Sequence, residues 1–150
     1  MAGESGGDTG GTQVVIFVDT SVWIDFFAGR DLRHVAALEQ FIRKEEDLAL
    51  CGIILTEILQ GIASDSTYHR VHQHLQPLIM LPMPERVFIK AANIYRSLRR
   101  QGTTIRKTND CIIAATVLEH RCHLLHNDRD FEPIARYFSM DTIDTRRFEQ

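Results

Sequence analysis

Short apolar runs alternate along the chain with segments in which apolar residues recur at helical spacing. Residues 14–18, VVIFV, form a continuous, β-branched run bounded by polar residues, which is typical of a strand buried on both faces. Further short apolar runs predict strands at residues 48–51, 78–81, 123–126 and 140–143.

Helical periodicity fills the intervals between these runs. Thr20 and Ser21 are predicted to cap the first helix at its start, and Gly29 is predicted to end it. The remaining helices are expected at residues 35–42, 53–62, 65–76, 85–100, 108–118 and 131–138. The clearest of them is 85–100, with an apolar stripe formed by Val87, Phe88, Ala91, Ile94, Tyr95 and Leu98. This alternation predicts a single α/β domain whose mostly parallel central sheet is flanked by helices on both faces.

Composition limits the class of protein further. The first twelve residues contain five glycines and no apolar segment, so residues 1–12 are expected to be a flexible tail before a folded domain over 13–150. No apolar run approaches the roughly 18 residues that span a bilayer. Three cysteines in 150 residues argue against a disulfide framework and favour a reducing, cytoplasmic setting.

Acidic residues follow the predicted strands at several separate places. Asp19 comes directly after the first strand, Glu57 lies on the helix after the second, and Asp110 is in the first turn of the helix that begins near residue 108. Asp128 and Asp130 follow the strand at 123–126. The carboxyl ends of parallel strands share one edge of the sheet, so these carboxylates are expected to converge. Mg²⁺ or Mn²⁺ would relieve their mutual repulsion and could hold a phosphodiester.

Each of these acids also has a structural interpretation. Asp19 could be only a helix N-cap, Asp110 could complement a helix dipole, and the NDRDF segment could be a turn and a cap. Glu57 is harder to explain in this way because it stands in the apolar stretch IILTEILQGI. The convergence of four segments on one edge favours a metal site. The sequence has no GxxxxGK[ST] motif that would compete with it.

Four motifs in this order resemble those of a known family. The segments IFVDTSVWIDFF, LTEILQGI, TNDCIIAAT and LLHNDRDFEPIA are similar to the acidic motifs of PIN-domain ribonucleases, and especially to VapC-type toxins of bacterial toxin–antitoxin pairs. The resemblance covers about residues 14–143. It implies a PIN fold, dependence on Mg²⁺ or Mn²⁺, endonucleolytic cleavage of RNA, a homodimer and a VapB-like antitoxin that occludes the site.

The resemblance also assigns roles to individual residues. It places an acidic quartet at Asp19, Glu57, Asp110 and either Asp128 or Asp130, and we favour Asp128 because it is nearer the end of the strand. Supporting roles fall to three polar residues, since Thr20 or Ser21 would orient Asp19 or a metal-bound water and Asn109 would do the same for Asp110.

Basic residues are concentrated just before Asp110. Residues 86–109 contain no acid but seven of the 17 basic residues, although the net charge of the chain is −3. Such a strip beside a metal site would collect the phosphate backbone of RNA. Arg86 and Lys90 are expected on a solvated helix face. The predicted RNA-binding residues are Arg99, Arg100, Arg106 and Lys107.

Other functions fit the sequence less well. A phosphatase with an aspartyl nucleophile at Asp19 would commonly carry a second acid where Ser21 stands, and a receiver domain would need a neighbouring acidic pair at the first strand and a lysine near the last. A non-catalytic PIN-like binding module would be expected to have lost some of the acids. Two groups are given structural roles: the histidines at 69, 72 and 74 belong to the surface, and Trp23, Phe26 and Phe27 to the core or a dimer interface.

Overall fold

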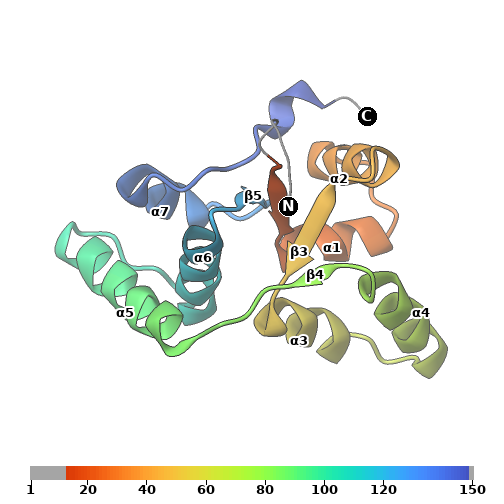
Figure 1. Cartoon of the computed structure of the whole chain (residues 1–150), viewed down its shortest axis with the longest axis horizontal. Helices are drawn as coiled ribbons and strands as arrows, with labels where there is room; N and C mark the ends of the chain where they lie inside the picture. The colour runs from red at the N-terminus through yellow and green to blue at the C-terminus, as the bar shows by residue number, and fades with distance from the viewer. Residues whose placement is uncertain (1–12, 149–150) are drawn as a thin grey trace, which may run out of the picture.

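A computed structural model describes residues 13–148 of the chain. Its centre is a four-stranded parallel sheet with the strand order β4-β3-β2-β5 (Figure 1). The strands are β2 (Val15–Val18), β3 (Asp47–Leu50), β4 (Ile79–Met80) and β5 (His123–Leu125). The predicted tail over 1–12 falls outside the described residues.

One predicted strand shrinks to a single bridge. Residues 140–143 were expected to form a strand, but only Thr142 bridges to Leu124 of β5. The two hydrogen bonds there run from Leu124 N to Asp141 O and from Ile143 N to Leu124 O, each over 2.9 Å. The chain therefore touches the sheet edge at one point and then turns into the short 3₁₀ helix η1 (Thr145–Arg147).

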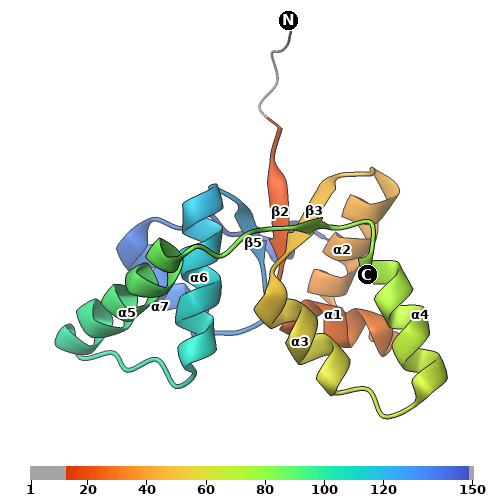
Figure 2. The same ribbon diagram turned by 60° about the horizontal axis from the view of Figure 1, so that its bottom comes forward.

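Seven α-helices surround the sheet in the described part of the chain. They are α1 (Thr20–Phe27), α2 (Arg33–Arg43), α3 (Gly52–Gln60), α4 (Asp65–Leu75), α5 (Glu85–Arg100), α6 (Thr108–His120) and α7 (Phe131–Phe138). Helices α1–α4 gather on one side of the sheet and α5–α7 on the other (Figures 1 and 2). The predicted α/β class is confirmed, and every strand pair is parallel.

The start of α1 differs from the prediction. Asp19, and not Thr20 or Ser21, is the N-cap residue; its backbone is extended, with φ −72° and ψ 156°, and its side chain accepts from Ser21 N. A carboxylate at the end of a buried strand can satisfy the free amides of the first helical turn, so the helix starts one residue earlier than a hydroxyl cap would allow. Asp19 is thereby fixed in position before any ligand is considered.

Helices α5 and α6 pack together through small and branched side chains. Four residues of the predicted stripe on α5 are buried, but Phe88 is 45% exposed, because it lies next to Val87 and so about 100° away around the helix. Helix α6 is buried along most of its length, including Ala114 and Ala115. Its last turn ends at Arg121, which takes the left-handed conformation with φ 55°.

Residues 13–148 contain neither a membrane-spanning helix nor a disulfide. No helix within 13–148 is long and apolar enough to cross a membrane. Cys51, Cys111 and Cys122 are all free and buried. Burial raises the pKa of Cys111 and that of Cys122 to about 11, so neither supplies a thiolate nucleophile at neutral pH. Trp23 is buried in the core, as the sequence predicted.

The order of the strands sets the place for a site. From β2 the chain moves outward to β3 and β4, and it then returns across the sheet to place β5 on the other side of β2. Where the winding direction reverses, the helices that follow the neighbouring strands diverge and leave a crevice at the strands' carboxyl ends. In this sheet that position lies beyond Val18 of β2 and Leu125 of β5, which are paired in register.

Candidate metal centre

Asp19 lies at the crevice and is 5% exposed. Its backbone N–H donates to Leu125 O over 2.9 Å, so it continues the ladder between β2 and β5. Ser21 donates to Asp19 Oδ2 through both its backbone N (3.0 Å) and its Oγ (2.6 Å). Ser21 Oγ in turn accepts from Asn127 N over 3.1 Å, which joins the two strand ends. Burial raises the pKa of Asp19 against the effect of the Ser21 bonds, and the charge of Asp128 raises it further.

Glu57 points toward the same crevice from α3 and is held by two neighbours. Thr20 Oγ1 donates to Glu57 Oε1 over 2.6 Å, and Asn109 Nδ2 donates to Glu57 Oε2 over 3.2 Å. Asn109 was expected to orient Asp110, its neighbour in sequence, but it reaches across to α3 instead. Adjacent residues on a helix point about 100° apart, so Asn109 and Asp110 serve different carboxylates.

Asp110 is a second buried acid of the site whose pKa is raised. It sits in the first turn of α6, is 5% exposed, and its Oδ2 atom is buried without a hydrogen-bond partner among residues 13–148. Burial raises the pKa of Asp110 to about 7; Lys107 opposes this rise, while Asp128 and Asp19 add to it. A buried carboxylate oxygen without a donor is costly unless a proton or a cation meets it.

Asp128 and Asp130 complete the cluster from the loop after β5. One carboxylate oxygen from each of Asp110, Asp128 and Asp130 lies within 4.8 Å of the others. Asp128 Oδ1 accepts from Asp130 N over 2.9 Å. The pKa of Asp128 is lowered, since the Asp130 N–H and the Lys107 ammonium outweigh its burial. The loop is thus built to keep Asp128 ionised.

The acidic residues predicted from the sequence lie at one end of the sheet. The tightest group is Asp110, Asp128 and Asp130, so the loop contributes both of its candidates for the fourth acid. Asp19 lies close to both Glu57 and that group, because the charges of Glu57 and Asp128 each raise the pKa of Asp19. An all-oxygen donor set, with one buried oxygen left unpartnered on Asp110, fits a hard divalent cation.

The predicted RNA-binding residues fall into two groups. Arg99 and Arg100 are exposed in the last turn of α5, where the Arg99 guanidinium lies 5.5 Å from the centre of the Tyr95 ring. Arg106 and Lys107 follow in the loop before α6 and form ion pairs with the acids of the cluster. The sequence analysis predicted that Arg106 and Lys107 lie near the site, but it did not predict their ion pairs with Asp130 and Asp128.

Two further groups were missed by the sequence analysis. His126 directly follows β5, and its Nδ1 accepts from Asp128 N over 3.1 Å, which helps to shape the acidic loop. The second group is centred on Asp25 of α1, which is buried and pairs with His34 Nε2 over 2.6 Å and with Arg30. Asp25 lies one helical turn beyond Ser21 and has no sequence signal that separates it from a surface acid.

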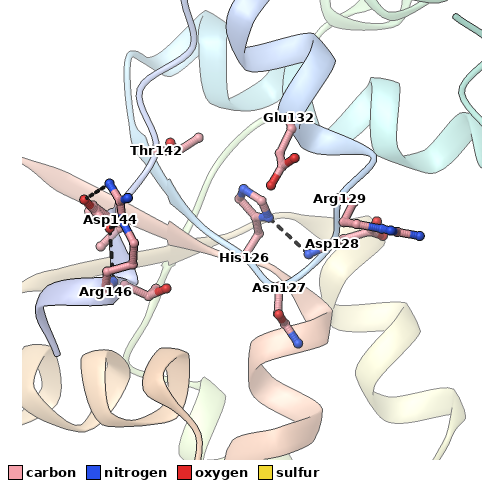
Figure 3. A pocket seen from close by; sticks show the side chains of 10 residues that line it. His126, Asn127, Asp128, Arg129, Glu132, Thr142, Asp144 and Arg146 are labelled. Atoms are coloured by element: carbon pink, nitrogen blue, oxygen red, sulfur yellow. Dashed lines mark hydrogen bonds and ion pairs between the residues drawn. The ribbon is translucent and has the colours of Figure 1, made fainter. Parts of the chain in front are cut away.

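A polar cavity of about 310 Å³ adjoins the cluster on the His126 side. Figure 3 shows the His126 ring and Glu132 on one wall, with Asp144 and Arg146 paired to each other on the other. Asp128 lines this cavity and also belongs to the acidic cluster, so the cavity and the cluster share one residue.

Comparison with known proteins places this arrangement in a family. The PIN-domain family profile matches residues 16–137. The chain is 36% identical over 136 residues to the VapC ribonuclease Mb1587 of Mycobacterium bovis and to the ribonuclease VapC11 of Mycobacterium tuberculosis, with 88% of this chain and 100% of each relative covered. A solved structure of VapBC-1 from nontypeable Haemophilus influenzae superposes with a TM-score of 0.69 at 19% identity, covering 89% of this chain and 100% of that one. The chain belongs to the PIN-domain family and, within it, to the VapC ribonucleases.

Proposed function

We propose that the chain is an endoribonuclease that depends on Mg²⁺ or Mn²⁺ and acts as the toxin of a toxin–antitoxin pair. The observation that carries the proposal is the grouping of Asp110, Asp128 and Asp130 within 4.8 Å beside the buried Asp19. These four carboxylates occupy the crevice where parallel α/β proteins bind their ligands. The relatives named above, two of them called ribonucleases, support the same reaction.

The acids have different parts in the proposed reaction. Asp19, Asp110 and Asp128 are the ligands we expect, with Glu57 or Asp130 binding directly or through water. A bound divalent ion would supply Lewis-acid stabilisation of the phosphate and lower the pKa of water. Ser21 fixes one oxygen of Asp19, and Thr20 and Asn109 fix both oxygens of Glu57, so these carboxylates are oriented before a ligand arrives.

The substrate is expected to approach across the end of α5. Arg99 and Arg100 lie exposed there and would contact phosphates of the RNA backbone. The cavity beside His126 is large enough to bind a small organic group, and it opens onto Asp128. We therefore place one nucleotide adjoining the cleaved bond in this cavity, with the phosphodiester at the acids.

Partners and location follow from the family. We propose a VapB-like antitoxin that covers the acidic centre, a homodimer, and action in the cytoplasm, where buried free thiols stay reduced. Related solved structures include VapBC-1 from nontypeable Haemophilus influenzae and VapBC2 from Rickettsia felis, which supports the antitoxin. Phe88 and Ile89 on α5 are 45% and 54% exposed and would gain from burial against a second copy.

The test is cleavage of a labelled RNA by the parent and by Asp19→Asn, each with Mg²⁺, with Mn²⁺ and with EDTA. Asparagine keeps the shape and can still accept from Ser21, so the fold should persist while cleavage falls at least about 100-fold. Asp65→Asn, a change at an exposed position of α4, is the matched control and should cleave like the parent. Cleavage that survives both EDTA and Asp19→Asn would refute the proposal, and binding without cleavage in the parent would favour a non-catalytic module.

A further inference from the structure

The loop before α6 carries two cations onto the acidic cluster. Lys107 Nζ donates to Asp128 Oδ2 over 3.1 Å, and Arg106 Nε donates to Asp130 Oδ2 over 3.3 Å. The acids are held by the fold, with side chains 15% and 19% exposed, whereas Lys107 and Arg106 are 60% and 73% exposed. Each basic side chain therefore reaches in from solvent and can move without unpacking the core.

Lys107 serves more than its direct partner. Its pKa is raised first by the hydrogen bond to Asp128 and then by the nearby charges of Asp110 and Asp19. In return, Lys107 is the main group that lowers the pKa of Asp110 against the effect of burial. One ammonium thus partly compensates three carboxylates, at a place where a divalent cation would supply twice its charge.

Both carboxylate oxygens of Asp128 already accept one hydrogen bond while Lys107 stays in place. Its Oδ1 accepts the backbone N–H of Asp130, which the loop holds, and its Oδ2 accepts Lys107. A divalent ion bound among Asp110, Asp128 and Asp130 would also lie a few ångströms from the ammonium and repel it. The flexible lysine is the partner that can leave.

We propose that Lys107 is an exchangeable counter-cation: it occupies Asp128 until a divalent ion binds the cluster, and the displaced ammonium then binds a phosphate of the RNA. Arg106 does the same at Asp130 with a weaker pair. The inference rests on the proposed function, because it needs a metal ion and RNA at this centre. It adds that metal binding and RNA binding are coupled through one side chain, so that each tightens the other.

The test separates the two roles of Lys107, because removing its charge should strengthen metal binding and weaken RNA binding. Mn²⁺ binding is measured by calorimetry without RNA for the parent, Lys107→Met and Lys107→Arg. Lys107→Met removes the competitor and should bind Mn²⁺ roughly threefold or more tightly, as expected for loss of a partly exposed ion pair. Lys107→Arg keeps a competing charge and should bind like the parent. Lys90→Met, at an exposed position on α5, removes one lysine elsewhere and should leave Mn²⁺ affinity unchanged.

RNA binding gives the second readout. With Ca²⁺ as the metal, the affinity of the parent for a short RNA should rise by more than that of Lys107→Met, and the slope of log affinity against log salt should be smaller for the variant by about one. Unchanged or weaker Mn²⁺ binding by Lys107→Met overturns the inference and leaves the proposed function standing. A parent that binds no Mn²⁺ at all overturns both.

Discussion

Replacing Asp110 with asparagine is expected to stabilise the protein in EDTA while it removes metal-dependent cleavage. The side chain is 5% exposed, and its Oδ2 has no donor within the described residues. Asparagine has nearly the same shape but carries no charge, and its amide can donate to the neighbouring carboxylates. The substitution therefore removes a repelling charge without opening a cavity.

The magnitude follows from the pKa of Asp110, which is raised from 3.8 to about 7. A raised pKa means that the folded protein holds the proton more tightly, so Asp110 lowers stability as the pH rises from about 4 to about 7. At about 1.4 kcal/mol per pKa unit, the ionised carboxyl costs on the order of 4 kcal/mol at pH 8 and roughly 2 kcal/mol at pH 5. Asp110→Asn should recover much of that cost, and more of it at pH 8 than at pH 5.

The assay is urea unfolding of the parent and Asp110→Asn at pH 5 and pH 8, with EDTA present throughout. Asp128→Asn is the matched control with the opposite sign. The pKa of Asp128 is lowered by the Asp130 N–H and Lys107, so its ionised form stabilises the fold and asparagine should destabilise it at pH 8. Both variants should lose Mg²⁺-dependent cleavage.

The reasoning fails if Asp110→Asn is less stable than the parent at pH 8, or if its advantage is larger at pH 5. Either result would mean that the carboxylate is not under electrostatic stress in the folded protein. Equal shifts for Asp110→Asn and Asp128→Asn would show that a general loss of negative charge, and not the burial of one acid, decides stability.

Two further predictions concern residues outside the acidic cluster. Asp25→Asn should destabilise the protein by about 2–3 kcal/mol at pH 7 because it breaks a buried pair with His34 and a second pair with the exposed Arg30. Since the pKa of Asp25 is lowered from 3.8, that deficit should shrink as the pH falls below about 4, which acid unfolding of parent and variant would reveal. Alanine at both Arg99 and Arg100 should weaken RNA binding and reduce its salt slope by about two, with unfolding unchanged; an unaltered slope in a filter-binding series would remove these side chains from the RNA path.

The fold was largely predictable because its strands are short and buried. The run at 14–18 has no polar position to confuse its period, and α5 shows a clear apolar stripe. One predicted strand was wrong, because a local apolar pattern does not show how many residues of a segment pair with a neighbouring strand. Residues 140–143 look like a strand, yet only one bridge forms, because the chain leaves the sheet edge at once. Phe88 was placed on the apolar stripe of this helix but is 45% exposed, because the spacing of apolar residues does not show how wide the buried face is.

The acids of the site were predictable for a different reason. Carboxylates after several parallel strands must meet at one edge, and the structure brings Asp110 and Asp128 together although 18 positions separate them. The partners of those acids were not predictable, because side-chain direction on a helix or loop depends on its final orientation. Asn109 adjoins Asp110 in sequence but bonds to Glu57, and Lys107 reaches Asp128 across a gap of 21 residues.

The position of β5 in the chain has a consequence for synthesis. Asp19 is made early, but the strand that pairs beside it and the loop that holds Asp128 come more than a hundred residues later. A growing polypeptide that has not yet passed residue 130 therefore lacks the opposing half of the centre, however well its amino-terminal strands and helices have formed. A polypeptide released before this point is therefore expected to be inactive, because Asp128 and Asp130 have not yet been added.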